Sequence, residues 1–163
     1  MTQQETFTHL YKHYAPGIRK LCLGYTGSSA QADDLLQETF MAVWNNLHKF
    51  RGEANYSTWV YRIAVNTCLL YLRKEKTTPQ KTDLDLLHNF AAEETDCESE
   101  VLLLYKCISR LPEAERLIIS MVLEDLPYED IAAIAGISEN NLRVKIHRIK
   151  KQLTEMFNSY ARV

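Results

Sequence analysis

Cationic and amide side chains gather on one face of a helix that we expect over residues 138–160. Leu142, Ile146, Ile149 and Leu153 recur at helical spacing and indicate the buried stripe of this helix. The opposite face carries Asn140, Val144, His147, Arg148 and Lys151, and it is flanked by Arg143, Lys145 and Lys150. Amides and guanidinium groups can bond to base edges, and lysines can bind phosphates. This face could therefore enter the major groove of DNA.

A short helix predicted over residues 127–135 comes immediately before this one. Gly136 can take the left-handed conformation that ends a helix, and Ser138 can cap the next helix. Together these features are typical of a tight helix-turn-helix. Two antiparallel helices that merely meet at a glycine turn, with a solvated basic face, fit the motif equally well.

A second group of cations lies beside aromatic rings on a helix predicted over residues 56–76. Arg62, Asn66 and Arg73 share one polar face, Trp59 lies at its edge, and Tyr56 precedes it. Cations that bind phosphates next to rings that stack on unpaired bases suit single-stranded DNA. Trp and Tyr on an amphipathic helix are more often part of the core, so Trp59 taken alone favours packing.

The helix predicted over residues 31–48 has a different outer face. Leu36, Phe40, Val43 and Leu47 recur at three- and four-residue steps and indicate its buried stripe. The outer face is acidic and contains a methionine, which suits a protein partner better than nucleic acid, with a solvated face as the default alternative. This face comprises Asp33, Asp34, Gln37, Glu38, Met41 and Asn45.

These elements require two small helical units in one all-α chain. In the first unit, a helix over residues 7–25 should be kinked or divided by Pro16 and Gly17, and residues 51–55 should form a loop. The second unit adds helices over residues 100–110 and 113–124, and Pro112 and Pro127 suit first-turn positions. No strand-like alternation or internal repeat accompanies this pattern.

Residues 77–99 separate the two units and are rich in acids. Between Lys81 and Lys106 the sequence has no Lys or Arg, so we expect a flexible tether. The apolar cluster at residues 84–90 could form a transient helix within it. The predicted organisation is therefore a first domain at residues 1–76, an acidic linker at 77–99, and a second domain with the helix-turn-helix at 100–163.

Composition excludes several classes of protein. A formal net charge of −2 over 163 residues argues against a protein that binds nucleic acid by bulk electrostatics alone. The absence of a long apolar run and of an export signal predicts a cytoplasmic protein without membrane insertion. The cysteines are widely spaced and should be reduced thiols. His9 and His13 could share a helix face, but no further ligand or catalytic pattern accompanies them, so we expect no metal, cofactor or enzymatic activity.

Together these segments resemble the extracytoplasmic-function (ECF) group of bacterial sigma factors. Four segments are similar to the family's second domain: Ala-Asp-Asp-Leu-Leu-Gln-Glu-Thr-Phe at residues 32–40, Trp44, Phe-Arg-Gly-Glu-Ala at 50–54, and Ser-Thr-Trp-Val-Tyr-Arg-Ile-Ala-Val-Asn at 57–66. Three more are similar to its fourth domain: Leu-Pro-Glu at 111–113, Tyr-Glu-Asp-Ile-Ala at 128–132, and His-Arg at 147–148. The resemblance covers nearly the whole chain outside the linker.

The resemblance implies a subunit that binds core RNA polymerase and directs promoter-specific transcription initiation. The acidic face of residues 33–45 would bind the clamp helices of the polymerase's largest subunit. The duplex minus-thirty-five element would be read by Ser138, Asn140, Asn141, Arg143, Val144, Lys145, His147, Arg148 and Lys151. The melted minus-ten element would be held by Phe50, Arg51, Asn55, Tyr56, Trp59, Arg62, Asn66 and Arg73. An anti-sigma factor is a further expected partner.

Two departures from the family pattern limit what can be carried over. Asn-Asn-Leu-Arg-Val-Lys stands at residues 140–145 where the family often has a Gly-Thr-Val-Lys-Ser-Arg type of run, so the promoter bases cannot be inferred. Pro127 also replaces a Ser-like cap. The main alternative is a dimeric helix-turn-helix regulator, which would bind duplex operators without polymerase but leaves the unit before the linker without a task.

Overall fold

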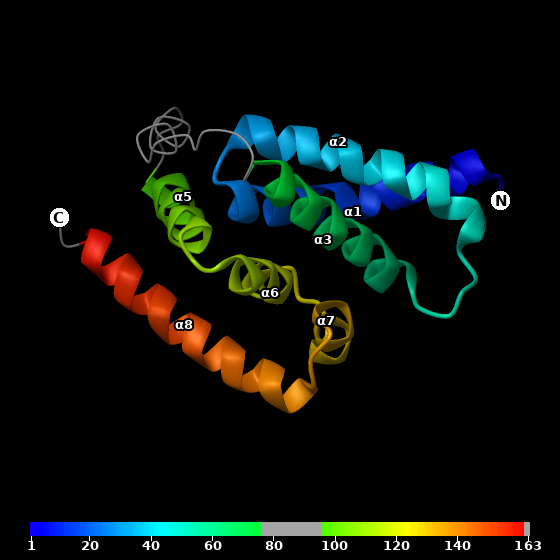
Figure 1. Ribbon diagram of the computed structural model, residues 1–163. Helices are drawn as coiled ribbons and strands as arrows, with labels where there is room; N and C mark the ends of the chain where they lie inside the picture. The colour runs from blue at the N-terminus through cyan, green and yellow to red at the C-terminus, as the bar shows by residue number, and fades with distance from the viewer. Residues whose placement is uncertain (76–95, 162–163) are drawn as a thin grey trace.

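The computed structural model describes residues 1–75 and 96–161, and regular structure in these ranges is helical throughout (Figure 1). This agrees with the predicted all-α class. In order, the elements are α1 (Gln3–Thr26), α2 (Ser29–Asn46), the 3-10 turn η1 (Leu47–Lys49), α3 (Tyr56–Glu75), α5 (Asp96–Ser109), α6 (Glu113–Leu123), α7 (Tyr128–Ala135) and α8 (Glu139–Ala161).

Helix α1 is continuous through Pro16, so of the two predicted effects of this proline, a kink or a division of the helix, the division is wrong. Ala15 and Ile18 on either side of Pro16 are buried, and this tertiary packing holds the helix together. Pro16 itself is exposed, and so is Lys12, whose carbonyl loses its helical donor and can bond to water instead. The helix begins with a capping box between Thr2 and Glu5.

Helices α1, α2 and α3 pack around one another and form the first unit. Ser28 caps α2 by accepting a hydrogen bond from the Gln31 amide at 3.3 Å, so the helix begins two residues before the predicted range. Residues 50–55 form a loop that includes the predicted one at 51–55, and the bounds of α3 are close to those predicted. Asn55 precedes α3, and its side-chain oxygen accepts bonds from both the amide and the hydroxyl of Thr58 at 2.8 Å.

The second unit differs from the prediction at its helix starts. Helix α5 begins at Asp96, so residues 96–99 are helical and do not belong to the linker. A helix can extend beyond its apolar stripe, and the acids that suggested a linker are also favoured in a first turn. Pro112 and Pro127 are N-caps with extended ψ angles of 148° and 143°, one residue before the predicted first-turn positions. The rest of the predicted linker, with the apolar cluster at 84–90, lies outside the described residues.

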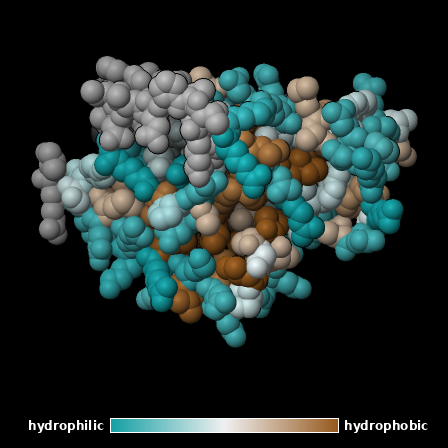
Figure 2. Space-filling model, in the orientation of Figure 1, coloured by the Kyte–Doolittle hydropathy of each residue, from teal (hydrophilic) through white to brown (hydrophobic). Residues whose placement is uncertain are grey.

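The two units pack directly against each other (Figure 1). Helix α1 contacts α5 and α6, and α3 contacts α7. Buried side chains from both units therefore form one continuous core, which includes Leu21 and Tyr25 of the first unit and Ile108 and Leu117 of the second. In Figure 2, apolar residues gather in a hollow at the middle of the visible face, where the units meet.

Candidate nucleic-acid and polymerase interfaces

Three aromatic side chains cluster where the 50–55 loop meets α3. The rings of Phe50 and Tyr56 stack with centroids 4.3 Å apart, and the Trp59 ring meets Phe50 edge-on at 5.2 Å. All three side chains are half-buried. Trp59 packs partly against the core, in line with the packing interpretation, and it also lines a surface cavity. Trp59 can therefore both pack against the core and stack on an unpaired base.

The surface cavity beside this cluster has a volume of about 200 Å³. Its wall combines a ring with cationic side chains, which is a suitable environment for a flat base and its phosphate. Four residues predicted for the minus-ten element lie around it: Phe50, Arg51, Trp59 and Arg62. The other lining residues are Glu53 and Ala54, which lie in the loop predicted to hold this element, and Lys49, which was not predicted. Lys49 carried a usable signal in the sequence, because it is a cation directly before Phe50.

Other residues predicted to hold the minus-ten element do not line this cavity. Asn66 and Arg73 are exposed and lie further along α3, about 6 Å and 16 Å from Arg62 along the helix axis. If a base of the melted DNA strand lies in the cavity, Asn66 and Arg73 could therefore contact only nucleotides further along that strand. The oxygen of Asn55 is occupied by its two bonds to Thr58, so its main observed role is to start α3.

Helices α7 and α8 form the predicted helix-turn-helix. Gly136 has a φ of 72°, and the amides of Gly136 and Ile137 both donate to the Ala132 carbonyl, at 2.9 Å and 3.1 Å. Ser138 accepts a bond from the Asn141 amide at 3.2 Å and caps α8 as predicted. The predicted inner stripe of α8 is buried in full, at Leu142, Ile146, Ile149 and Leu153.

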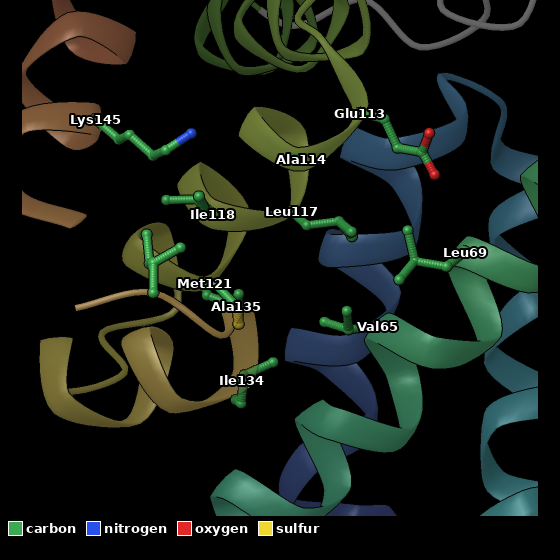
Figure 3. Close-up of a pocket in the computed structure, with 11 residues that line it drawn as sticks. Val65, Leu69, Glu113, Ala114, Leu117, Ile118, Met121, Ile134, Ala135 and Lys145 are labelled. Carbon is green, nitrogen blue, oxygen red and sulfur yellow. The ribbon is translucent and has the colours of Figure 1, made fainter. Parts of the chain in front are cut away.

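The outer face of α8 is exposed along its length. The exposed side chains are Asn140, Asn141, Arg143, Val144, His147, Arg148, Lys150 and Lys151. Arg143 is held in place, with its guanidinium 4.0 Å from Glu139 and 5.4 Å from the centre of the Tyr128 ring. Lys145 is half-buried and lines the apolar cavity between the units, away from this face (Figure 3).

The predicted polymerase-binding residues are all exposed on α2: Asp33, Asp34, Gln37, Glu38, Met41 and Asn45. Met41 keeps 64% of its surface exposed and lines one groove with Trp44 and Tyr11, which are 40% and 44% exposed, so the three form an apolar patch that suits a contact site. Asp33 accepts a bond from Arg19 Nε at 2.8 Å, so part of its charge is compensated.

A groove beside this face was missed by sequence reasoning. It has a volume of about 810 Å³ and runs between α1 and α2, with Gln37, Met41 and Asn45 on one side. Phe7 and Tyr11 of α1 form the other side, and their rings contact those of Phe40 and Trp44. The four-residue spacing of Phe7 and Tyr11 was the available signal.

Several buried groups have shifted pKa values. Burial raises the pKa of Tyr61 and of Tyr105, with a smaller contribution from the Glu124 carboxylate. The pKa of the Cys68 thiol is raised by its hydrogen bond with Cys22 and by burial. Cys22, Cys68 and Cys107 are buried free thiols. These groups lie in the core, away from the surfaces described above.

His9 and His13 stack on the exposed face of α1, with ring centroids 6.2 Å apart. Within residues 1–75 and 96–161, no three His, Cys, Asp or Glu side chains gather in a way that could hold a metal ion. The helices of the same ranges include none that is long and apolar enough to span a membrane.

Comparison with known proteins matches both units to one family. Residues 10–78 match sigma-70 region 2, and residues 102–153 match sigma-70 region 4. The ECF RNA polymerase sigma-E factors of Salmonella typhi and Escherichia coli are 31% identical over 164 residues, covering 92% of this chain and 85% of theirs. The ECF RNA polymerase sigma factor RpoE of Cereibacter sphaeroides is 26% identical, covering 93% of this chain and 88% of its own.

Solved structures share the fold. The sigma factor RpoE in complex with the anti-sigma factor NepR from Bartonella quintana superposes with a TM-score of 0.79 at 20% identity, covering 94% of this chain and 98% of that one. CnrH, in complex with the cytosolic domain of CnrY, gives a TM-score of 0.69 at 18% identity, covering 96% and 90%. The chain belongs to the ECF sigma factors of bacterial RNA polymerase, with sigma-70 region 2 followed by sigma-70 region 4.

Proposed function

We propose that this chain binds core RNA polymerase through α2, holds the melted minus-ten element with α3 and its preceding loop, and reads the minus-thirty-five element with α8. The observation that carries the proposal is the pairing of two unlike surfaces in one sigma factor. One is a small cavity walled by Trp59 and Arg62, and the other is the long exposed face of α8. An unstacked base fits the cavity, and the exposed face of α8 fits into the major groove of a duplex.

The α2 face is the proposed contact with the clamp helices of the polymerase's largest subunit. Exposed acids around a prominent methionine suit a protein partner, because a polar rim and an apolar centre are the usual anatomy of such interfaces. Attachment to polymerase also accounts for the net charge of −2. A factor mounted on a large enzyme can bind each promoter element weakly, because both surfaces act at high effective concentration.

The role proposed here is not enzymatic, and its place is the cytoplasm, where polymerase acts. Binding, positioning and strand capture require no catalytic group of this chain. An anti-sigma factor is a proposed partner, since the structurally similar sigma factor RpoE from Bartonella quintana is in complex with the anti-sigma factor NepR.

Run-off transcription with core polymerase over a pool of genomic promoters tests the proposal. The chain alone should show little sequence-specific duplex binding, and core polymerase supplied with it should initiate at new, defined start sites. Start sites that do not change when the protein is added would refute the proposal. Tight duplex binding by a dimer of the free chain would instead favour a conventional helix-turn-helix regulator.

Affinity capture from cells tests the proposed anti-sigma partner separately. A stoichiometric protein inhibitor should accompany the chain under non-inducing conditions. Recovery of the chain without such a partner would count against this part of the proposal and leave the polymerase role in place.

A further inference from the structure

Helix α8 carries one large apolar side chain on its exposed face. Within residues 139–160, Val144 is the one large hydrophobic residue that is exposed, and it keeps 50% of its surface in solvent. At about 100° per residue it points roughly 160° to 180° away from Leu142, Ile146 and Leu153, which are buried. In Figure 1, α8 lies along the outer edge of the second unit, and it contacts α5, α6 and α7. Packing within the chain therefore does not explain Val144.

Valine is also a poor residue for a helix position that only faces water. Its side chain branches at Cβ and loses rotamer freedom in a helix, so valine is less favourable there than Lys, Gln or Glu. Single exposed apolar residues are nevertheless common on protein surfaces, and exposure alone assigns no role. The neighbours of Val144 on the helix are what indicate its role.

Val144 lies between two side chains that are suited to reading bases. Asn140 is one helical turn before it and Arg148 one turn after it, at steps of about 6 Å along the helix axis, and both are exposed. An asparagine amide matches the adenine edge in the major groove, and a guanidinium matches the guanine edge. Asn140 is the second residue of α8, and a recognition helix places its N-terminal residues against base edges. Val144 therefore lies in the part of α8 that a major groove would receive.

The major groove offers a branched hydrocarbon side chain one suitable partner. Every base edge there presents hydrogen-bond donors or acceptors, and only thymine adds an apolar group, its C5-methyl. Valine cannot replace the water bonds of a polar edge that it covers, which makes such a contact unfavourable. Against a thymine methyl it instead removes apolar surface from water on both sides. Valine also stands at position 144 where the family run described above has serine, so a side-chain hydroxyl contact is not available here.

We propose that Val144 reads a thymine of the upstream promoter element through its C5-methyl group, between a base contacted by Asn140 and a base contacted by Arg148. This inference rests on the function proposed above, in which α8 enters the minus-thirty-five duplex. A step of about 6 Å along the helix spans less than two base pairs at about 3.4 Å each. The thymine should therefore lie within about two base pairs of an adenine read by Asn140 and of a guanine read by Arg148.

Removal of a single methyl group tests this contact in the assembled holoenzyme. The probe is the promoter defined by run-off transcription, with each thymine of its upstream element replaced in turn by deoxyuridine, which pairs alike but lacks the methyl. At one position this replacement should weaken binding of core polymerase carrying the wild-type chain by about 3-fold to 5-fold, as expected for one buried methyl group. Val144→Ala should bind the two promoters alike at that position. Full methyl dependence retained by Val144→Ala, or no methyl dependence in the wild type, would overturn the proposal.

Further variants separate the methyl contact from other effects of substitution. Val144→Ile keeps a branched apolar side chain and should retain the methyl dependence, whereas Val144→Ser should lose it. Val101→Ala is the matched control, because Val101 is also a half-exposed valine, at 49%, but lies on α5, and it should leave the methyl dependence unchanged. Since both valines are on the surface, all variants should keep wild-type helicity by circular dichroism. Equal loss of methyl dependence in Val144→Ser and Val101→Ala would contradict a specific role of Val144.

Selection from promoters randomised across the upstream element provides an independent measurement. Holoenzyme with the wild-type chain should enrich thymine at one position by at least about 3-fold over holoenzyme with Val144→Ala, with adenine and guanine enriched nearby. Enrichment of a sequence without that thymine preference would refute the role of Val144 and leave the role of α8 in place. Enrichment of no upstream sequence by either chain would instead refute the reading of this element by α8, and with it the proposed function.

Discussion

The two DNA-facing surfaces of this sigma factor differ in how their side chains are held. In region 2, Phe50, Tyr56 and Trp59 contact one another around a small cavity. In region 4, the outer face of α8 is exposed along its length, and its side chains extend from a helix that is anchored on the opposite side by Leu142 and Ile149. An unstacked base needs a preformed pocket, whereas the base edges of a duplex are already exposed at regular spacing in its grooves. The difference matches the state of the DNA that each surface is proposed to bind.

The largest effect should come from removing the central ring of the region 2 surface. Trp59→Ala takes away one wall of the cavity and a stacking platform, so transcript yield should fall by about 10-fold to 100-fold. Permanganate reactivity of the melted strand, measured with core polymerase, checks the cause. Trp59→Phe keeps a ring and should lose much less. If Trp59→Ala weakens binding to a minus-thirty-five duplex as strongly as it reduces melting, the two surfaces are not separate.

Removing a guanidinium from α8 should produce the next largest effect. Arg148→Ala should reduce discrimination between the correct and a mismatched upstream element by about 5-fold to 100-fold. Competition with variant promoters in the presence of core polymerase measures this ratio. Arg110→Ala, at an exposed arginine between α5 and α6, is the control. Equal discrimination by Arg148→Ala and the control would remove Arg148 from the reading face.

A lysine on the same face should affect affinity without affecting selectivity. Lys151→Ala should weaken binding to all upstream elements alike and reduce the slope of log affinity against log salt by about 1. A salt titration with two promoters of different upstream sequence distinguishes this uniform loss of affinity from the loss of discrimination expected for Arg148→Ala. A change confined to one promoter would show that Lys151 reads bases.

The smallest effect concerns the contact between the regions. Burial raises the pKa of Glu124, with nearby Lys20 opposing the shift. The folded chain therefore binds this proton more tightly than the unfolded chain, and the stabilisation is present at low pH and lost as pH rises through the folded pKa. Glu124→Gln should raise the melting temperature at pH 7.5 by about 1–3 °C, and the difference should shrink toward pH 4.5. A constant difference across this range would rule out titration of Glu124.

Local patterns were enough to predict most elements and the exposure of most site residues. The α8 stripe and the Gly136 turn followed from helical periodicity and from backbone preferences, which depend on near neighbours along the chain. Packing between distant segments was not accessible in this way. The continuity of α1 through Pro16, the inward position of Lys145 and the groove formed with Tyr11 all depend on which helices meet. The contact of Tyr25 with Glu113 joins residues 88 positions apart, and no local signal marks it.

Attachment of this chain to polymerase through the α2 face of region 2 is the step on which both DNA contacts depend. Titration of labelled chain against core polymerase tests this attachment. The variant for comparison combines Glu38→Lys with Met41→Arg, which change the charge and the apolar centre of the α2 face. The wild type should bind, and the double variant should bind at least about 10-fold more weakly while keeping the same helicity, since a central contact typically contributes 2 kcal/mol or more. Absence of wild-type binding, or equal binding by the two chains, would show that the α2 face does not attach this chain to polymerase.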